Sequence, residues 1–160
     1  PEFDEVPGAN AAGGFAPIEA YAWHRKLIER RGAEYDQRVR TRIERAAGMS
    51  AVEYIALCAA RSDLIARVAA RTTGFDALVM PTVTMSAPPI AAFARDDDYR
   101  HLNAAILRNT SVINFLDGCA ATIPIQPPGA APVGLMIVGG QGADHRLLAV
   151  ARGIEATLGR

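Results

Sequence analysis

The stretch LRNTSVINFLDGCAATIPIQPPGAAPVGLMIVGGQGADHRLLAVARGIE, residues 107–155, contains the clearest succession of structural elements in the chain. Two apolar runs, Ala121–Ile125 and Val133–Val138, are predicted to be strands. The Pro127-Pro128-Gly129 segment between them is typical of a turn. A helix of about Tyr99 to Leu116, closed by Gly118, is expected before the strands.

Asp144 is predicted to cap a last helix after the second strand. One face of this helix is apolar and is formed by Leu147, Leu148, Ala151, Ile154 and Leu158. The segment therefore predicts two helices that enclose two buried strands.

Three helices and a further strand are expected upstream of this segment. The predicted helices run from Pro17 to Gly32, where a left-handed stop costs least, from Glu34 to Ala47, closed by Gly48, and from Ala51 to Thr73. Ser50 and Glu53 have the spacing of a capping box before the third helix. The expected strand is Phe75–Met80, ended by Pro81; loops are expected at residues 1–15, 88–89 and 96–98.

These elements predict an α/β fold: a fragment of a mixed sheet, with about three strands in this chain and helices on both faces. Residues 1–73 are expected to be mainly helical, and residues 74–160 to contain strands and helices. Three strands alone leave two open edges, and uncovered apolar edges promote aggregation. We therefore expect a missing part of the protein to supply neighbouring strands, and the isolated chain to self-associate.

The composition excludes several classes of partner. The 160 residues contain 17 acidic and 17 basic side chains, so no nucleic-acid or acidic-lipid footprint is present. Cys58 and Cys119 lie in apolar runs and are predicted to be buried free thiols. No signal-like or long apolar segment is present, so we expect a cytoplasmic protein without a membrane contact. The sequence begins with Pro1 and its first methionine is Met49, which suggests part of a longer protein.

Three kinds of site are not supported by the spacing of residues. The glycines of Gly139-Gly140-Gln141-Gly142 do not match a dinucleotide-binding loop, and Asp144 would repel a phosphate there. Zinc requires clustered ligands, whereas His24, His101 and His145 are scattered. Neither a metal nor a cofactor is therefore expected. No Gly-x-Ser-x-Gly nucleophile elbow is present, although spacing alone does not exclude a Ser-His-Asp triad.

Several short motifs resemble the amidase signature family of serine amide hydrolases. The similar segments are Glu19-Ala20-Tyr21, Arg42-Ile43, Phe75–Thr82, Asn109-Thr110, Asn114 with Asp117-Gly118, Ile123-Pro124, Pro132–Leu135 and Val138-Gly139. The glycine- and serine-rich catalytic stretch of that family is absent. The resemblance therefore implies that residues 1–160 are the C-terminal part of a single amidase domain, whose catalytic part lies upstream.

The resemblance also implies a chemistry for the whole protein: hydrolysis of a carboxamide to a carboxylate and ammonia or an amine. Members of the family use a serine nucleophile, a bridging serine and a lysine that must be neutral to act as the base. The one lysine, Lys26, is predicted to lie on a charged helix face without the desolvation that a base requires. Ser50, Ser62, Ser86 and Ser111 have no glycine-rich setting. The triad is therefore expected outside this chain, and the chain alone is expected to be inactive.

Five residues are candidates for the substrate pocket: Arg42, Tyr21, Asn109, Thr110 and Asn114. The resemblance implies that in the glutamine-using relatives an arginine in the Arg-Ile context of Arg42 engages the substrate carboxylate; a solvated arginine on a basic helix is the alternative. Asn109 is predicted to face the core side of its helix, where it either fixes a nearby loop or contacts substrate. The same alternatives hold for Thr110 and Asn114. Tyr21 and His24 lie one helical turn apart and either reach a cleft or form a packed aromatic pair.

Two other functions compete with the amidase hypothesis. One is a fragment of a glutamyl-tRNA amidotransferase, similar to the amidase-like component of that enzyme, which would bind partner proteins and tRNA. In the glutamine-using relatives an acidic residue lies three residues before the threonine matched by Thr110, but this chain has Leu107 there. That difference and the neutral charge argue against the amidotransferase. The other is a non-catalytic binding or scaffold module.

Overall fold

The structure, a computed structural model, describes residues 5–6 and 14–159, and the chain divides into two units, Glu2–Leu64 and Ile65–Arg160. The boundary between the units lies within helix α4 (Ala51–Thr72). The loop expected at residues 1–15 falls mostly outside the described residues, and Glu5 and Val6 are helical.

The unit Glu2–Leu64 is helical throughout its described part. After the first described helical residues it contains α2 (Phe15–Arg31), the 3-10 turn η1 (Gly32–Glu34), α3 (Gln37–Glu44), the 3-10 turn η2 (Arg45–Gly48) and the first half of α4. Helix α2 packs against α3 and η2, and Ile28, Ile43 and Ala46 are buried between them. The three predicted helices are therefore present, with the second one shorter than expected.

The capping box at the start of α4 is confirmed. The Ser50 backbone N–H and its hydroxyl donate to Glu53 Oε2 at 2.7 and 2.8 Å, and the Glu53 N–H donates to Ser50 Oγ at 3.2 Å. The hydrogen bond from the Ser50 backbone, and then that from its hydroxyl, lower the pKa of the Glu53 carboxyl. These reciprocal bonds satisfy donors that a helix N-terminus otherwise leaves open.

The unit Ile65–Arg160 contains a three-stranded antiparallel sheet. Its elements after α4 are β1 (Leu78–Pro81), the 3-10 turn η3 (Ile90–Phe93), α5 (Asp96–Phe115), β2 (Cys119–Pro124), β3 (Gly134–Gly139) and α6 (Asp144–Thr157). The strand order is β1-β3-β2, and β3 pairs antiparallel with both neighbours. The turn predicted between β2 and β3 is present, because Ala130 N–H donates to Pro127 O at 3.1 Å and Gly129 has a φ of 79°.

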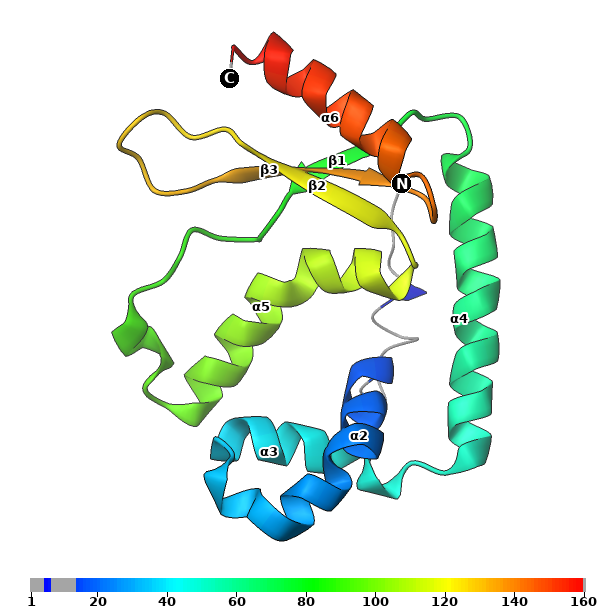
Figure 1. The fold of residues 1–160 in the computed structure, drawn as a ribbon. Coiled ribbons are helices and arrows are strands. Elements are labelled where there is room, and N and C mark those ends of the chain that lie inside the picture. The colour runs from blue at the N-terminus through cyan, green and yellow to red at the C-terminus, as the bar shows by residue number, and fades with distance from the viewer. Residues whose placement is uncertain (1–4, 7–13, 160) are drawn as a thin grey trace. The chain divides into compact units, whose positions relative to one another are not determined.

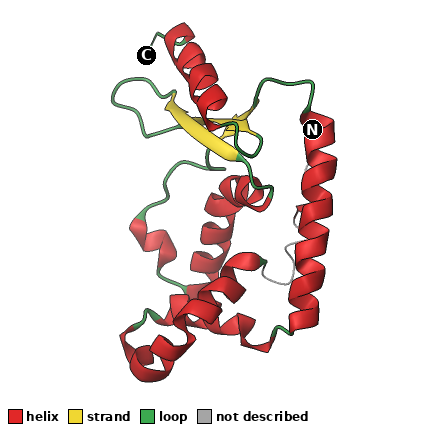
Figure 2. Cartoon of the chain, turned by 45° about the vertical axis from the view of Figure 1, so that its right-hand side comes forward, coloured by secondary structure: helices red, strands yellow, loops and turns green. Residues whose placement is uncertain are grey.

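Helices α5 and α6 cover opposite faces of this sheet (Figures 1 and 2). On one face, Ile123 and Ile137 pack against Leu147 and Ala151 of α6. On the other face, Met136 and Val138 pack against Ile113 of α5. Successive residues of β3 thus point to two different cores, as the alternation of a strand requires. The predicted α/β fold with helices on both faces is confirmed.

Several predicted helix ends were wrong. Ala143, not Asp144, is the N-cap of α6. Asp144 lies in the first turn, where its negative charge interacts favourably with the positive end of the helix dipole. Helix α5 begins at Asp96 rather than Tyr99. Its first turn contains three acidic residues, whose charges likewise interact favourably with the helix dipole. Gly32 has a φ of −61° and is not a left-handed stop. Asp117 rather than Gly118 adopts the positive φ, 58°, after α5.

Strand β1 and helix α3 are shorter than their patterns predicted. Phe75 is 59% exposed and closes the end of α4 through an N–H donated to Thr72 O, so the strand begins only at Leu78. Helix α3 begins at Gln37 because Asp36 caps it by accepting hydrogen bonds from the N–H groups of Arg38 and Val39. In both cases a local hydrogen bond sets the boundary.

Candidate functional site

The candidate residues of the sheet unit include Asn109, which joins α5 to the end of β1. Its Nδ2 donates to the Pro81 carbonyl oxygen at 2.7 Å across 28 residues of sequence. Three residues further along, Thr84 Oγ1 donates to Ala105 O on the same helix at 2.8 Å. Asn109 is half-buried, and its amide fixes the main chain that follows β1. The geometry is that of the loop-fixing alternative.

A pair of threonines crosses the sheet next to this contact. Thr82 Oγ1 lies 3.1 Å from Thr122 Oγ1, although the two residues flank the central strand on opposite sides. Gly134 of β3 lies between them, and a Cβ there would be 2.5 Å from Thr122 Cγ2 and 2.6 Å from Thr82 Oγ1. The absence of a side chain at Gly134 therefore allows the two hydroxyls to meet. The motifs Pro81-Thr82 and Pro132–Leu135 stand out in the sequence, but their contact was not predicted.

The other candidates on α5 differ in exposure. Thr110 is half-buried and its hydroxyl donates to Leu107 O at 3.1 Å, a bond within the helix. Asn114 is exposed in the last turn of α5, where its carbonyl accepts the N–H of Asp117 at 3.2 Å. Leu107, which replaces the acidic residue of the glutamine-using relatives, is 44% exposed. The helix thus presents an apolar side chain at this position.

Tyr21 and Arg42 belong to the helical unit. Tyr21 is half-buried on α2, and Arg42 is exposed in the last turn of α3. Within the described residues Arg42 makes no ion pair, whereas its neighbour Arg40 binds Glu44 at 2.9 Å. The aromatic partner of His24 is Tyr35. The His24 Nδ1 atom lies 2.7 Å from the Tyr35 hydroxyl oxygen, and the two rings are packed edge-to-face.

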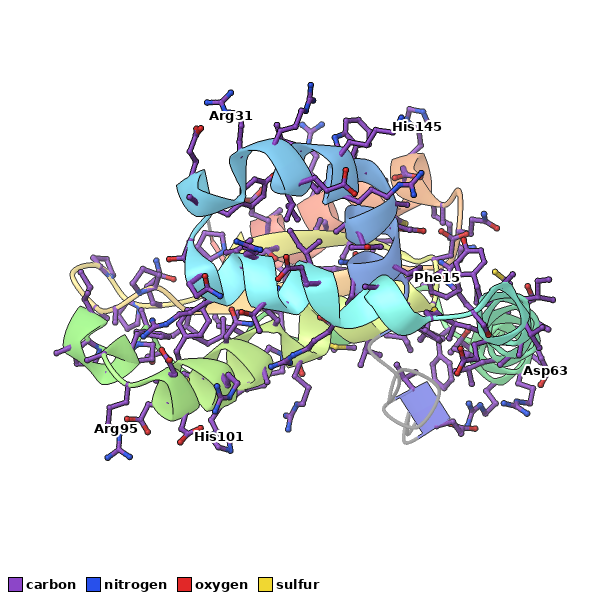
Figure 3. All side chains as sticks on the ribbon, turned by 90° about the horizontal axis from the view of Figure 1, so that it is seen from below. Phe15, Arg31, Asp63, Arg95, His101 and His145 are labelled. Atoms are coloured by element: carbon purple, nitrogen blue, oxygen red, sulfur yellow. The ribbon has the colours of Figure 1, made fainter. Side chains whose placement is uncertain are left out.

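A second aromatic cluster joins α2 to the first half of α4. Phe15, labelled in Figure 3, lies edge-to-face with Tyr54 at 5.8 Å, and the Arg61 guanidinium lies 5.3 Å from the Phe15 ring centroid. The Cys58 thiol, by its charge interaction and then its hydrogen bond, raises the pKa of Tyr54. This cluster packs the start of α2 against α4. The helical periodicity of the sequence does not predict this contact.

The groups that an amide hydrolase would need for covalent catalysis are exposed in this chain. Lys26 lies on the outer surface of α2, and its carbonyl accepts the Nε–H of Arg30. All four serines are exposed or lie on helix surfaces, and Ser50 serves the helix cap described above. None of these side chains lies in a desolvated setting that would activate a base or a nucleophile.

The turn between β3 and α6 is held by side-chain contacts. Gln141 Nε2 donates to Asp117 Oδ2 at 2.7 Å, and Cys119 Sγ lies 3.3 Å from Gly140 O.

Both cysteines are free and half-buried, so the prediction that they are buried was too strong. Two histidines of the sheet unit, labelled in Figure 3, lie on different helices: His101 on α5 and His145 on α6.

The described residues contain neither a metal-binding group nor a membrane span. Among them, no three His, Cys, Asp or Glu side chains are grouped closely enough to hold a metal ion. In the same residues no helix is long and apolar enough to span a bilayer. The cytoplasmic location expected from the sequence stays a prediction.

Comparisons with known proteins identify the family. The Amidase family model matches residues 7–148. The 2-amino-5-chloromuconic acid deaminase of Comamonas testosteroni is 32% identical over 161 residues, which cover 100% of this chain and 35% of that protein. A crystal structure of an amidase superimposes with a TM-score of 0.82 at 23% identity over 96% of this chain and 36% of the other, a likeness of fold. The chain thus spans about a third of the length of these proteins, and it belongs to the amidase family.

Proposed function

We propose that this chain is the C-terminal portion of an enzyme that hydrolyses a carboxamide to a carboxylate and ammonia or an amine. The observation that carries the proposal is the family match over residues 7–148. The partners in this proposal are a small amide substrate and the catalytic part of the same protein. This chain covers only 35% of the length of the deaminase, which supports the proposal that the catalytic part lies in a longer polypeptide.

The proposed reaction uses a Ser-Ser-Lys triad that lies outside this chain. The nucleophilic serine oxygen attacks the amide carbon while its proton passes through the bridging serine to the neutral lysine. Collapse of the tetrahedral intermediate breaks the C–N bond, and the leaving nitrogen takes a proton back. Water then hydrolyses the acyl-enzyme by the same route. The exposure of Lys26 supports this assignment of the triad to another part of the protein.

The first prediction is that the isolated 160-residue chain has no amidase activity. Its one lysine is exposed, whereas the lysine base of the proposed triad needs a buried setting. Incubation with a panel of simple amides and a fluorophosphonate probe should give neither turnover nor labelling. The full-length amidase, treated in parallel, should be labelled. Stoichiometric labelling of any serine in the isolated chain would contradict the assignment.

Within the proposed function, Arg42 binds a carboxylate of the substrate. Its guanidinium is exposed and makes no ion pair among the described residues, so it keeps its hydrogen-bond donors for a ligand. The name of the deaminase relative describes a substrate that is an acid and carries an amino group. A carboxamide that also carries a carboxylate is therefore the substrate class that we propose.

The second prediction concerns this arginine. Arg42→Ala in the full-length enzyme should lower kcat/KM for a carboxylate-bearing amide by at least about tenfold, equivalent to about 1.4 kcal/mol. Stability should change little, because exposed arginines contribute little. Arg38→Ala, a change to another arginine of the same helix, is the matched control and should keep wild-type kinetics. Equal kinetics in both variants would show that Arg42 is a solvated surface residue.

The alternative functions gain less support. A fragment of a glutamyl-tRNA amidotransferase would need an acidic residue where α5 presents the partly exposed Leu107. A non-catalytic scaffold module does not account for the family match over most of the chain. An upstream Gly-Ser-Ser-Gly-rich segment in the same reading frame would favour the amidase over the scaffold.

A further inference from the structure

The sequence contains one Asp-Gly pair, Asp117-Gly118, and it lies at the junction between α5 and β2. An aspartate before glycine isomerises more readily than other aspartates, because glycine has no side chain to hinder attack by its own nitrogen on the aspartate carboxyl carbon. Asp117 is exposed, so water reaches it. The pair is therefore chemically labile wherever the local structure lets the two groups meet.

The fold favours both members of this labile pair. Asp117 has a φ of 58°, and aspartate is among the few non-glycine residues that adopt this left-handed conformation readily. A Cβ at Gly118 would lie 3.0 Å from Gly139 O and 3.1 Å from Ile113 Cγ2, closer than most real Cβ contacts. The geometry of the junction thus favours the same two residues whose sequence is labile.

Both reacting groups are held by other partners in the folded chain. The Gly118 N–H, whose nitrogen would attack, donates to Ile113 O at 3.1 Å. The Asp117 carboxylate accepts a hydrogen bond at Oδ2 from Gln141 Nε2 at 2.7 Å, and the Asp117 N–H donates to Asn114 O at 3.2 Å. Ring closure requires the Gly118 nitrogen to lose its proton and the carboxyl carbon to approach that nitrogen. These hydrogen bonds must therefore open before the pair can react.

We propose that Asp117 is a site of spontaneous isomerisation to isoaspartate, which the folded protein suppresses through the hydrogen bonds of Gly118 and Gln141. In the reaction the Gly118 nitrogen bonds to Asp117 Cγ and gives up its proton, and the carboxyl OH leaves with that proton as water. The product is a cyclic succinimide, which water then opens. Addition of water at the side-chain carbonyl restores Asp117, whereas addition at the main-chain carbonyl leaves Gly118 attached through the side chain, as isoaspartate.

The consequence for the fold is a main chain that is longer by one methylene group at this junction. Cys119, the next residue, pairs with Gly139 at one end of the β2–β3 ladder, and the Gly118 N–H bonds to Ile113 O. The added carbon atom displaces both contacts, so the isomerised chain should refold poorly at this end of the sheet. Local opening at the end of α5 thus becomes irreversible with time. The inference does not depend on the proposed amide hydrolysis.

Peptide mapping of the full-length protein tests the proposal without any variant. Native protein and protein unfolded in guanidinium chloride are incubated in parallel at neutral pH, and isoaspartate in the tryptic peptide 109–146 is measured by mass spectrometry and by isoaspartyl methyltransferase labelling. Isoaspartate at Asp117 should form at least about tenfold more slowly in the native protein, because only locally opened molecules react. Asp144, in the same peptide but before a histidine, is the internal control and should stay aspartate in both samples. Equal rates at Asp117 in the two samples, or no isoaspartate in the unfolded one, would overturn the proposal.

A variant tests the protecting hydrogen bond itself. Gln141→Ala removes the donor to Asp117 Oδ2 and should speed isomerisation in the native protein by about threefold or more. Gln37→Ala is the matched control: it removes a glutamine that donates to Thr41 on α3 and should keep the wild-type rate. Far-UV circular dichroism checks that both variants fold. A wild-type rate in Gln141→Ala, or equal acceleration by both variants, would overturn the role of Gln141.

Discussion

Replacement of Ile137 by alanine is expected to lower the free energy of unfolding by about 2–5 kcal/mol. Ile137 is 0% exposed on the central strand and packs in one cluster with Ile123, Leu147 and Ala151. Strand β2 and helix α6 meet at this side chain, so the surrounding groups are held on several sides and cannot close the cavity. The loss of buried methyl groups and the remaining void therefore both contribute.

Urea unfolding followed by far-UV circular dichroism should measure this loss. The single tryptophan, Trp23, is 84% exposed on α2 in the other unit, so its fluorescence is a poor probe of the sheet. Val79→Ala is the control: Val79 pairs with Ile137 across the β1–β3 ladder but is 58% exposed. Its substitution should cost about 1 kcal/mol or less. Equal losses in the two variants would mean that the Ile137 cluster is not a packed core.

The second large effect is expected at Gly134, where alanine should cost about 1–3 kcal/mol through overpacking. The new Cβ would lie 2.5 Å from Thr122 Cγ2 and 2.6 Å from Thr82 Oγ1, both below any normal contact. The cost is steric, since Gly134 does not have a positive φ. The Thr82–Thr122 hydrogen bond should be lost with it, because the two side chains must move apart.

A double-mutant cycle identifies the cause. Thr122→Ser removes the Cγ2 methyl and keeps the hydroxyl, so it should relieve part of the cost of Gly134→Ala, and the two changes should be coupled by about 0.5 kcal/mol or more. Gly140→Ala is the control, because a Cβ there meets nothing within 4 Å. Strictly additive effects at Gly134 and Thr122 would contradict the steric explanation.

The parts of the fold that could be predicted from the sequence are those whose signals are local. Ser50 and Glu53 lie three residues apart and satisfy each other, and the Pro127-Pro128-Gly129 turn fixes the β2–β3 hairpin within a few residues. Where two neighbouring residues could each adopt the conformation that ends a helix, the sequence did not predict which of them does so. Asp117 takes the positive φ instead of Gly118, and a Cβ at Gly118 would lie 3.0 Å from the Gly139 carbonyl oxygen, so the glycine allows a close approach there.

The contacts of the candidate site could not be predicted in the same way. Asn109 was expected to fix a nearby segment or contact substrate, but its partner, the carbonyl of Pro81, lies 28 residues away. The Thr82 and Thr122 hydroxyls are 40 residues apart and meet only because β3 inserts between their strands with a glycine at that point. The periodicity of a single sequence does not predict the order of the strands in the sheet. Both contacts depend on that order.

The central place of β3 also has a consequence for synthesis on the ribosome. Strand β1 leaves the ribosome without its partner, since Leu135, which pairs with Pro81, follows later in the sequence. At roughly 5–20 residues per second, the intervening segment of about 50 residues takes roughly 3–10 s to be made. During that interval Val79 and Met80 are apolar and unpaired. Pro81, by its missing N–H, limits premature pairing with other nascent chains until β3 arrives.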